Sequence, residues 1–158
     1  MDFTIRKACE KDIPRIIVLL KQVAQIHNDS RPDLFKAGSK KYNENDLTAL
    51  LCNDKVTVFI ASDEYDTALG YIFCFMQEYK DHVIMQDIKT LYIDDLCIDE
   101  NIRGSGIGKA LYTHACNYAE KQGCYNITLN VWSGNDNALS FYEKLGMIEQ
   151  KRTLEMIL

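Results

Sequence analysis

A glycine-rich segment between a strand-like run and a helix-like run constrains the fold of this chain more than any other feature. Residues 91–98 are mostly apolar, and apolar side chains recur at helical spacing through residues 107–122. Glycines stand between the two runs at positions 104, 106 and 108. A strand, a glycine turn and a helix start direct free backbone N–H groups and the positive end of a helix dipole at one point. The sequence therefore predicts a site for a phosphate-bearing ligand.

Two familiar phosphate-binding loops do not fit this segment. A Walker A loop needs its first glycine where the chain has Arg103, and a hydroxyl residue where it has Ala110. A dinucleotide-binding G-x-G-x-x-G motif needs its third glycine at Leu111 or at Lys109, depending on where it starts. The ligand is thus expected to be neither a Walker-type nucleotide nor a dinucleotide.

The spacing Arg103-x-x-Gly106-x-Gly108 resembles the R/Q-x-x-G-x-G/A loop with which N-acetyltransferases of the GNAT superfamily grip the pyrophosphate of acetyl-CoA. Residues 135–146 resemble a second motif of that superfamily, N-x-x-A-x-x-F-Y-x-x-x-G. Both motifs occur in the family's order and at its usual separation, and together they cover about residues 91–148. On these motifs the chain is identified as a member of the superfamily.

The resemblance and the order of elements imply one α/β domain over residues 1–158. Its expected fold is a GNAT-like mixed, largely antiparallel central sheet with helices on both faces and splayed strands at the acetyl-CoA site. Periodicity and turn residues predict helices over 12–27, 46–52, 107–122 and 135–145, and strands over 3–8, 56–62, 68–77, 91–98, 125–131 and 149–157.

Composition narrows the class of partner. The chain has 158 residues, with 18 Lys and Arg against 23 Asp and Glu, so its net charge is −5. This balance argues against nucleic acid or an anionic membrane as a partner. It favours a cationic substrate, although an ordinary acidic protein has the same balance. A homodimer is expected only by analogy with the family.

Cysteine and histidine usage predicts a cytoplasmic protein without a metal site. The six cysteines are scattered, and most lie in apolar segments, as reduced thiols do. The three histidines are far apart. No apolar run reaches the roughly 18 residues of a membrane span, and the N-terminus lacks the apolar region of a signal peptide.

The family resemblance assigns acetyl-CoA to named positions. Backbone N–H groups of the loop would hold the pyrophosphate, with added charge from the side chains of Lys109 and Arg103. The backbone of one strand would bind the pantetheine arm as an extra strand, and Asn135 would contact that arm or cap its own helix. The residues implied in cofactor binding are Leu96, Cys97, Ile98, Arg103, Gly104, Ser105, Gly106, Ile107, Gly108, Lys109, Asn135 and Tyr142.

Tyr142 occupies the position of the family's general acid. A phenol with a pKa near ~10 can protonate a thiolate whose conjugate acid has a pKa near ~8.5. The other interpretation is a core aromatic, because Tyr142 shares a helical stripe with Phe141.

The general base is expected at Asp94. The run Tyr92-Ile-Asp94-Asp95 is similar to the Glu-Asp pair of polyamine acetyltransferases, whose proposed base Asp94 matches. A solvated carboxylate at a strand bend is the alternative. Neighbouring strand residues point to opposite faces, so only one of Asp94 and Asp95 is expected to face the cleft directly. Acetylators of protein N-termini place a glutamate where this chain has Asn130, and an amide cannot accept a proton.

The acceptor would contact His27, Arg31 and Phe35 of a polar loop, together with Asp95 and Asn130. For the loop, an Arg31–Asp33 ion pair that merely holds it in shape is the alternative. The function expected from all these features is direct transfer of an acetyl group from acetyl-CoA to the primary amine of a small, cationic molecule. The alternatives are a protein N-terminal or lysine acetyltransferase, and an acyl-CoA-binding sensor without turnover.

Overall fold

The computed structural model describes residues 2–158 and forms an open five-stranded sheet in the order β1-β2-β3-β4-β5. The first four strands are antiparallel, and β5 pairs with β4 in parallel. The strands are β1 (Thr4–Lys7), β2 (Val56–Ser62), β3 (Ala68–Tyr79), β4 (Ile88–Ile98) and β5 (Asn126–Leu129). The helices are α1 (Ile13–Ser30), α2 (Glu44–Leu51), α3 (Ile107–Lys121) and α4 (Asp136–Lys144), with short 3₁₀ turns η1 (Glu10–Asp12) and η2 (Glu100–Ile102).

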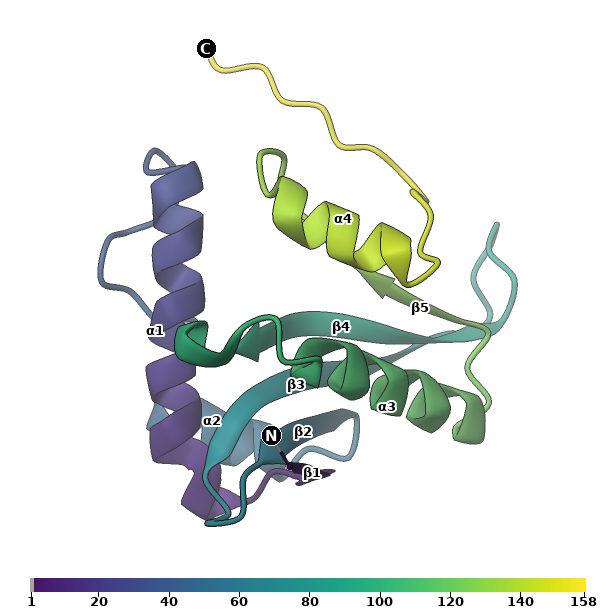
Figure 1. Ribbon diagram of the computed structural model, residues 1–158. Coiled ribbons are helices and arrows are strands. Elements are labelled where there is room, and N and C mark those ends of the chain that lie inside the picture. Colours follow the sequence, from purple (N-terminus) through teal and green to yellow (C-terminus); the bar gives the residue numbers. More distant parts are fainter. Residues whose placement is uncertain (1) are drawn as a thin grey trace.

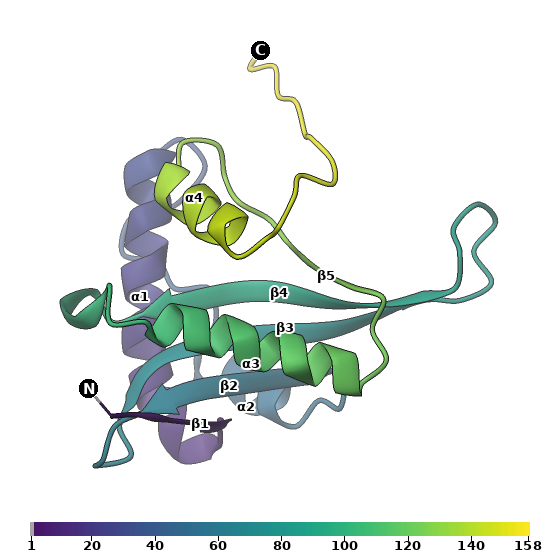
Figure 2. The same cartoon turned by 45° about the vertical axis from the view of Figure 1, so that its right-hand side comes forward.

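Helices cover both faces of the sheet (Figure 1). Helices α1 and α2 pack against one face through a cluster that includes Leu20, Leu47, Tyr71 and Phe73. Helix α3 packs against the other face, where Leu111 belongs to a second cluster, and α4 lies beyond α3 toward β5 (Figures 1 and 2). The expected fold class, a mixed and largely antiparallel sheet between helices, is confirmed.

Strand β4 contains a bulge that changes which side chains share a face. Phe73 of β3 lies opposite Asp95, but the next residue, Cys74, lies opposite Ile93, so Asp94 is one extra residue in β4. Ile93 belongs to the cluster under α3, and Phe73 belongs to the cluster under α1. Asp94 and Asp95 therefore both project toward α1 and α2. The prediction that the two carboxylates point to opposite faces is wrong, because it assumed an unbroken pleat.

Strands β4 and β5 separate after a short stretch of pairing. Thr90 to Ile93 pair with Asn126 to Leu129, and there β5 ends while β4 continues to Ile98. Residues 95–98 are consequently paired with β3 on one edge, and no described strand pairs with their other edge. The expected splayed strands are present, and one edge of β4 is open at their divergence.

The strand expected over residues 149–157 does not form. From Ile148 to Leu158 the described chain makes no backbone–backbone hydrogen bond, and it leads away from the sheet beyond α4 (Figures 1 and 2). A strand needs a neighbouring strand edge to satisfy its peptide groups, and this segment has none within its own chain. The prediction was wrong for that reason.

Gly70 of β3 has no room for a side chain, because a Cβ there would lie 2.7 Å from the Cys97 carbonyl oxygen of β4. Overpacking of a tight core contact costs typically about 1–3 kcal/mol. We therefore expect Gly70→Ala to lower the free energy of unfolding by about that amount, measured by chemical denaturation. The matched control is Gly108→Ala, whose Cβ would meet Phe141 at an ordinary 3.5 Å. Equal losses of stability in both variants would contradict this account of the β3–β4 contact.

Candidate active site

The glycine loop is held in a conformation that glycine alone adopts readily. Gly104 and Gly106 have φ angles of +83° and +85°, in the left-handed region. Gly106 is the N-cap of α3, and no side chain caps this helix start, so the N–H groups of its first turn are open to an external acceptor. Gly108 has no positive φ, and a Cβ there would make only ordinary contacts, 3.5 Å from Phe141 and 3.6 Å from Ile98.

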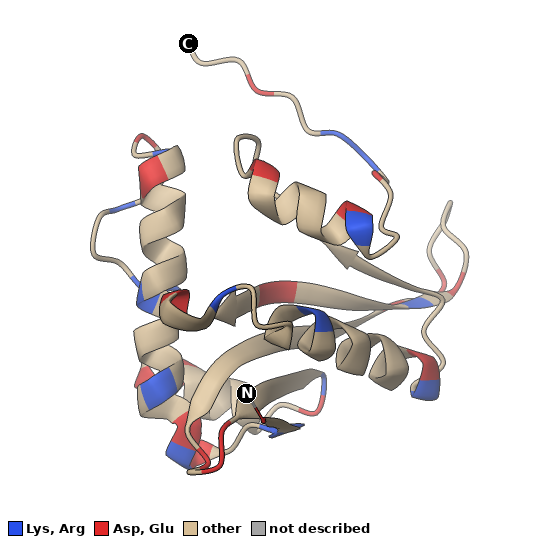
Figure 3. Ribbon diagram, in the orientation of Figure 1, with Lys and Arg blue, Asp and Glu red and all other residues tan. Residues whose placement is uncertain are grey.

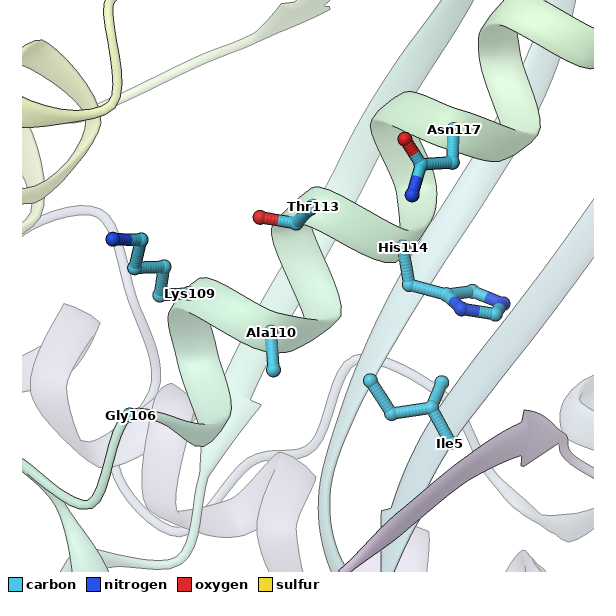
Figure 4. A pocket seen from close by; sticks show the side chains of 7 residues that line it. All are labelled: Ile5, Gly106, Lys109, Ala110, Thr113, His114 and Asn117. Carbon is cyan, nitrogen blue, oxygen red and sulfur yellow. The ribbon is translucent and has the colours of Figure 1, made fainter.

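Two cations flank this loop. Arg103 donates from Nε to the Ile98 carbonyl at 3.4 Å, which draws its side chain back toward the end of β4. Lys109 lies on the first turn of α3, at the edge of an open hollow that begins at Gly106 and runs along the helix beside Ile5 of β1, and its side chain points away from His114 and Ile5 (Figure 4). The hollow is lined by Ile5, Gly106, Lys109, Ala110, Thr113, His114 and Asn117.

His114, which also lines the hollow, is a packing residue. Its ring lies edge-on to Phe59 with 4.5 Å between centroids, and burial lowers its pKa. Of the residues that line the hollow, Lys109, at its loop end, carries the positive charge.

The open edge of β4 begins at the bulge and ends at this loop. Leu96, Cys97 and Ile98 lie opposite Ile72, Tyr71 and Gly70 of β3, and their other edge carries no strand. Peptide groups on an unpaired strand edge can bind an extended ligand as an added strand. Burial raises the pKa of the Cys97 thiol to about 12, so this thiol stays protonated and is unsuited to covalent catalysis.

Tyr142 reaches this region from α4. Its ring packs edge-on against Phe141, with 5.0 Å between centroids, and contacts the cluster beneath α3. Burial raises the pKa of Tyr142, and the charge of Asp95 raises it further. The side chain of Asn135 accepts from the Ala138 N–H at 3.2 Å, so Asn135 caps α4 as one of its two expected roles requires. Tyr142 thus belongs to the packed stripe and also stands near a carboxylate.

The bulge places the Asp95 carboxylate beside that of Asp94, and the two have different environments. Asp94 accepts from Lys41 Nζ and from Tyr42 Oη, each at 2.7 Å, and both partners lie just before α2. Asp95 accepts from Tyr71 Oη at 2.7 Å. Burial raises the pKa of Asp95 to about 6, against the lowering effect of the Tyr71 hydrogen bond. Asp94 is therefore neutralised by an ammonium group, whereas Asp95 can exchange a proton near neutral pH.

The end of α1 and the polar loop after it form an aromatic wall. Helix α1 continues to Ser30, so His27 lies in the helix and not, as the sequence predicts, in the loop. His27 stacks on Phe35 at 5.0 Å, and Phe35 meets Trp132 edge-on at 5.2 Å. Burial and the charge of Lys41 lower the pKa of His27, so its ring is mostly neutral at pH 7. Phe35 therefore joins the end of α1 to the segment after β5.

Arg31 and Asn130 are held by other protein groups. Arg31 binds Asp33 at 2.7 Å, the pairing anticipated for a loop that simply keeps its shape, and it also binds Glu155 of the C-terminal segment at 2.9 Å. Asn130 donates to Tyr92 Oη at 3.1 Å.

Sequence reasoning missed Lys41, Tyr42 and Tyr71. The first two precede the N-cap of α2, and no feature of the local sequence indicates a role in the site. Tyr71 lies in a strand whose neighbouring residues are apolar. A hydroxyl in such a strand is the one available signal, because a buried tyrosine usually finds a polar partner.

No group of three or more His, Cys, Asp or Glu side chains in residues 2–158 is arranged to hold a metal ion. None of the described helices combines the length and apolar character needed to cross a membrane.

Comparison with known proteins identifies the family. Glucosamine 6-phosphate N-acetyltransferase of Trypanosoma brucei brucei is 36% identical over 65 residues, which is 41% of this chain and 42% of that protein. N-alpha-acetyltransferase 50 of Danio rerio is 38% identical over 90 residues, 55% of this chain and 50% of that protein. The matches thus span about half the length of these relatives, or less.

Similarity to a solved structure extends over the whole chain. A mutant of the BH1408 protein from Bacillus halodurans superposes with a TM-score of 0.94 at 34% identity, over 98% of this chain and 99% of that one. The sequence model of the Acetyltransferase (GNAT) family matches residues 20–147. The chain has the glycine loop and the splayed strands, and the family model matches most of its length. The chain therefore belongs to the GNAT acetyltransferase family.

Proposed function

We propose that this protein transfers an acetyl group from acetyl-CoA to a primary amine of a small, cationic molecule by direct attack. One observation carries the choice of acceptor: an ammonium group, that of Lys41, already rests on Asp94 at the bulge. The site beside the open edge of β4 therefore accommodates a primary ammonium.

Acetyl-CoA would be held by backbone groups at two places. The N–H groups of residues 104–109 would bind its pyrophosphate, with Lys109 adding charge. The open edge of β4 at residues 96–98 would bind the pantetheine arm. The two places are joined by a short stretch of chain, residues 99–103, between the end of β4 and the loop.

The acceptor would enter on the α1 and α2 side, where both carboxylates project. A diamine, a polyamine or an aminoglycoside could keep one ammonium on a carboxylate while another nitrogen reacts. Aliphatic amines have pKa values near ~10.4, so few are neutral at pH ~7, and a carboxylate must accept the proton. The sequence assigns this role to Asp94. The contacts support a division in which the substrate's ammonium replaces that of the half-exposed Lys41 on Asp94, and Asp95, whose pKa is about 6, accepts the proton.

The transfer step would form one bond and break one. The amine nitrogen attacks the thioester carbonyl carbon, the C–N bond forms, and the C–S bond breaks. The leaving thiolate takes a proton from Tyr142. Burial keeps the Tyr142 phenol protonated, and apolar surroundings would raise the pKa of the CoA thiol, as burial raises the pKa of the Cys97 thiol on the other face of the sheet.

Replacing Tyr142 by phenylalanine keeps the packing against Phe141 and removes the proton donor. General acid catalysis contributes on the order of 100- to 10,000-fold. We expect kcat to fall at least about tenfold, a conservative floor on that range, with acetyl-CoA affinity unchanged. Steady-state kinetics and isothermal titration measure the two quantities. A variant with wild-type kcat would leave Tyr142 a packing residue only.

The two carboxylates are distinguished by pH profiles of Asp94→Asn and Asp95→Asn. Asp95 is deprotonated above its pKa of about 6, so the rate deficit of Asp95→Asn should be complete above that pH and shrink below it, where the wild-type carboxyl is also protonated. Asp94→Asn should leave the pH profile unchanged. It should raise KM for a diamine by about tenfold, because one charged hydrogen bond to the substrate is lost. If Asp94→Asn alone removes the pH dependence, Asp94 is the base, as the sequence predicts.

The acceptor class is tested by thiol release over a panel of amines and peptides. The similarity to an N-alpha-acetyltransferase makes a peptide N-terminus the second candidate, although this chain carries Asn130 where N-terminal acetylators place a glutamate. Dications as the best acceptors would support the proposal, and peptides as the best acceptors would replace it. Acetyl-CoA binding without turnover on any acceptor would favour the sensor.

The six free cysteines support a reducing compartment such as the cytoplasm.

A further inference from the structure

Lys41 places a primary amine of the chain itself in the candidate acceptor site. It lies on the segment between α1 and α2, which carries basic residues, and it bonds to Asp94 of β4, which carries acidic ones (Figure 3). Lys41 Nζ donates to Asp94 Oδ1 at 2.7 Å and to the Asp94 carbonyl oxygen at 3.4 Å, and it lies 5.6 Å from the centroid of the Tyr42 ring. This ammonium therefore occupies the place that the proposed function gives to the ammonium of a small-molecule acceptor.

The Lys41 side chain is only lightly restrained there. It is 46% exposed, whereas the side chain of Asp94 is 13% exposed, so the ammonium covers the carboxylate from the solvent side. Water screens an ion pair of this kind, and the four-carbon stem of a lysine is flexible. Lys41 Nζ can therefore leave Asp94 and turn toward the open edge of β4.

A proton acceptor and the expected position of the acyl group lie beside this amine. Burial raises the pKa of Asp95 to about 6, against the lowering effect of the Lys41 charge, so the ammonium acts on this carboxylate as well. With the pyrophosphate at the glycine loop and the pantetheine arm along residues 96–98, the thioester end of acetyl-CoA would lie on the bulge side of the open edge. An amine, a proton acceptor and an acyl donor held together react far faster than the same groups free in solution.

We propose that Lys41 is a modification site, at which the protein acetylates its own Nζ with acetyl-CoA. The reaction rests on the proposed function, because it is the same transfer with an internal acceptor. Lys41 Nζ gives one proton to Asp95, which passes it to solvent, and then attacks the thioester carbonyl carbon. The C–N bond forms, the C–S bond breaks, and the leaving thiolate takes a proton from Tyr142. The nitrogen's second proton restores Tyr142, so the products are N-acetyl-Lys41, CoA and one proton.

This modification changes the acceptor site. Acetylation removes the positive charge of a lysine and its ability to form a salt bridge. Asp94 then loses its ammonium partner and becomes free for the ammonium of a small-molecule substrate. The unmodified Lys41 competes for the same carboxylate, so its acetylation lowers KM for a cationic acceptor.

Tandem mass spectrometry tests the modification on the full chain, incubated with acetyl-CoA and no added amine. Cleavage before Asp33 and before Asp46 releases a peptide with three lysines, Lys36, Lys40 and Lys41. We expect a single acetyl group on Lys41, added at a rate per chain that does not depend on protein concentration. Lys36 and Lys40 are exposed and report uncatalysed acetylation in the same peptide. Excess CoA, which competes for the glycine loop, should slow the reaction at Lys41.

The consequence for the acceptor is tested with Lys41→Gln, which removes the charge as acetylation does. We expect KM for a diamine to fall by about tenfold, because the competing charged hydrogen bond to Asp94 is lost. The matched control is Lys40→Gln, which makes the same change at the neighbouring exposed lysine and should leave KM as it is in the wild type.

Transfer to a diamine, measured on the same sample, separates this inference from the proposed function. Acetylation of the diamine with Lys41 unmodified would overturn the inference and leave the proposed function standing. A chain that binds acetyl-CoA and acetylates neither would contradict both. Equal acetylation of the three lysines, or a reaction at Lys41 that excess CoA does not slow, would show uncatalysed chemistry and also overturn the inference. An unchanged KM in Lys41→Gln would overturn the competition between Lys41 and the substrate.

Discussion

The divergence of β4 from β5, together with the bulge just before it, is the constraint on which the rest of the site depends. Hydrogen bonding between the two strands stops at Ile93, and the extra residue, Asp94, turns the following part of β4 while it stays bound to β3. Peptide groups between two strands normally cost free energy when they have no hydrogen-bond partner. The open edge of β4 leads into a glycine loop whose N–H groups are also free. A ligand with an extended arm and a phosphate end can therefore bind both the edge and the loop.

The same bulge sets the electrostatics on the opposite side of the opening. Two successive carboxylates share one face, where an unbroken strand would separate them. They differ because Lys41 and Tyr42 bind Asp94, while Asp95 is buried against Tyr71. Burial without an ion pair of its own raises the pKa of Asp95, and the same carboxylate raises the pKa of Tyr142 across the opening. A single irregularity of register thus gives two successive carboxylates different partners.

Local features of the site could be predicted from the sequence. Positive φ angles at Gly104 and Gly106 follow from the glycine pattern before a helix, and the cap at Asn135 follows from residue type. Features that depend on pairing between distant segments could not. The bulge depends on the register of β4 against β3, and Tyr42 meets Asp94 from 52 positions away. The last strand was expected from alternation alone, but alternation does not say whether a partner edge is in reach.

The account rests on acetyl-CoA spanning the loop and the open edge of β4, and hydrogen exchange with and without acetyl-CoA tests this directly. At a ligand concentration about 100 times Kd, bound amides should exchange up to about 100-fold more slowly. The account predicts this protection in residues 94–98 and 104–109, with the β3–β4 loop at residues 80–87 unchanged. Saturating acetyl-CoA that protects neither segment, or that protects another part of the chain instead, would contradict it.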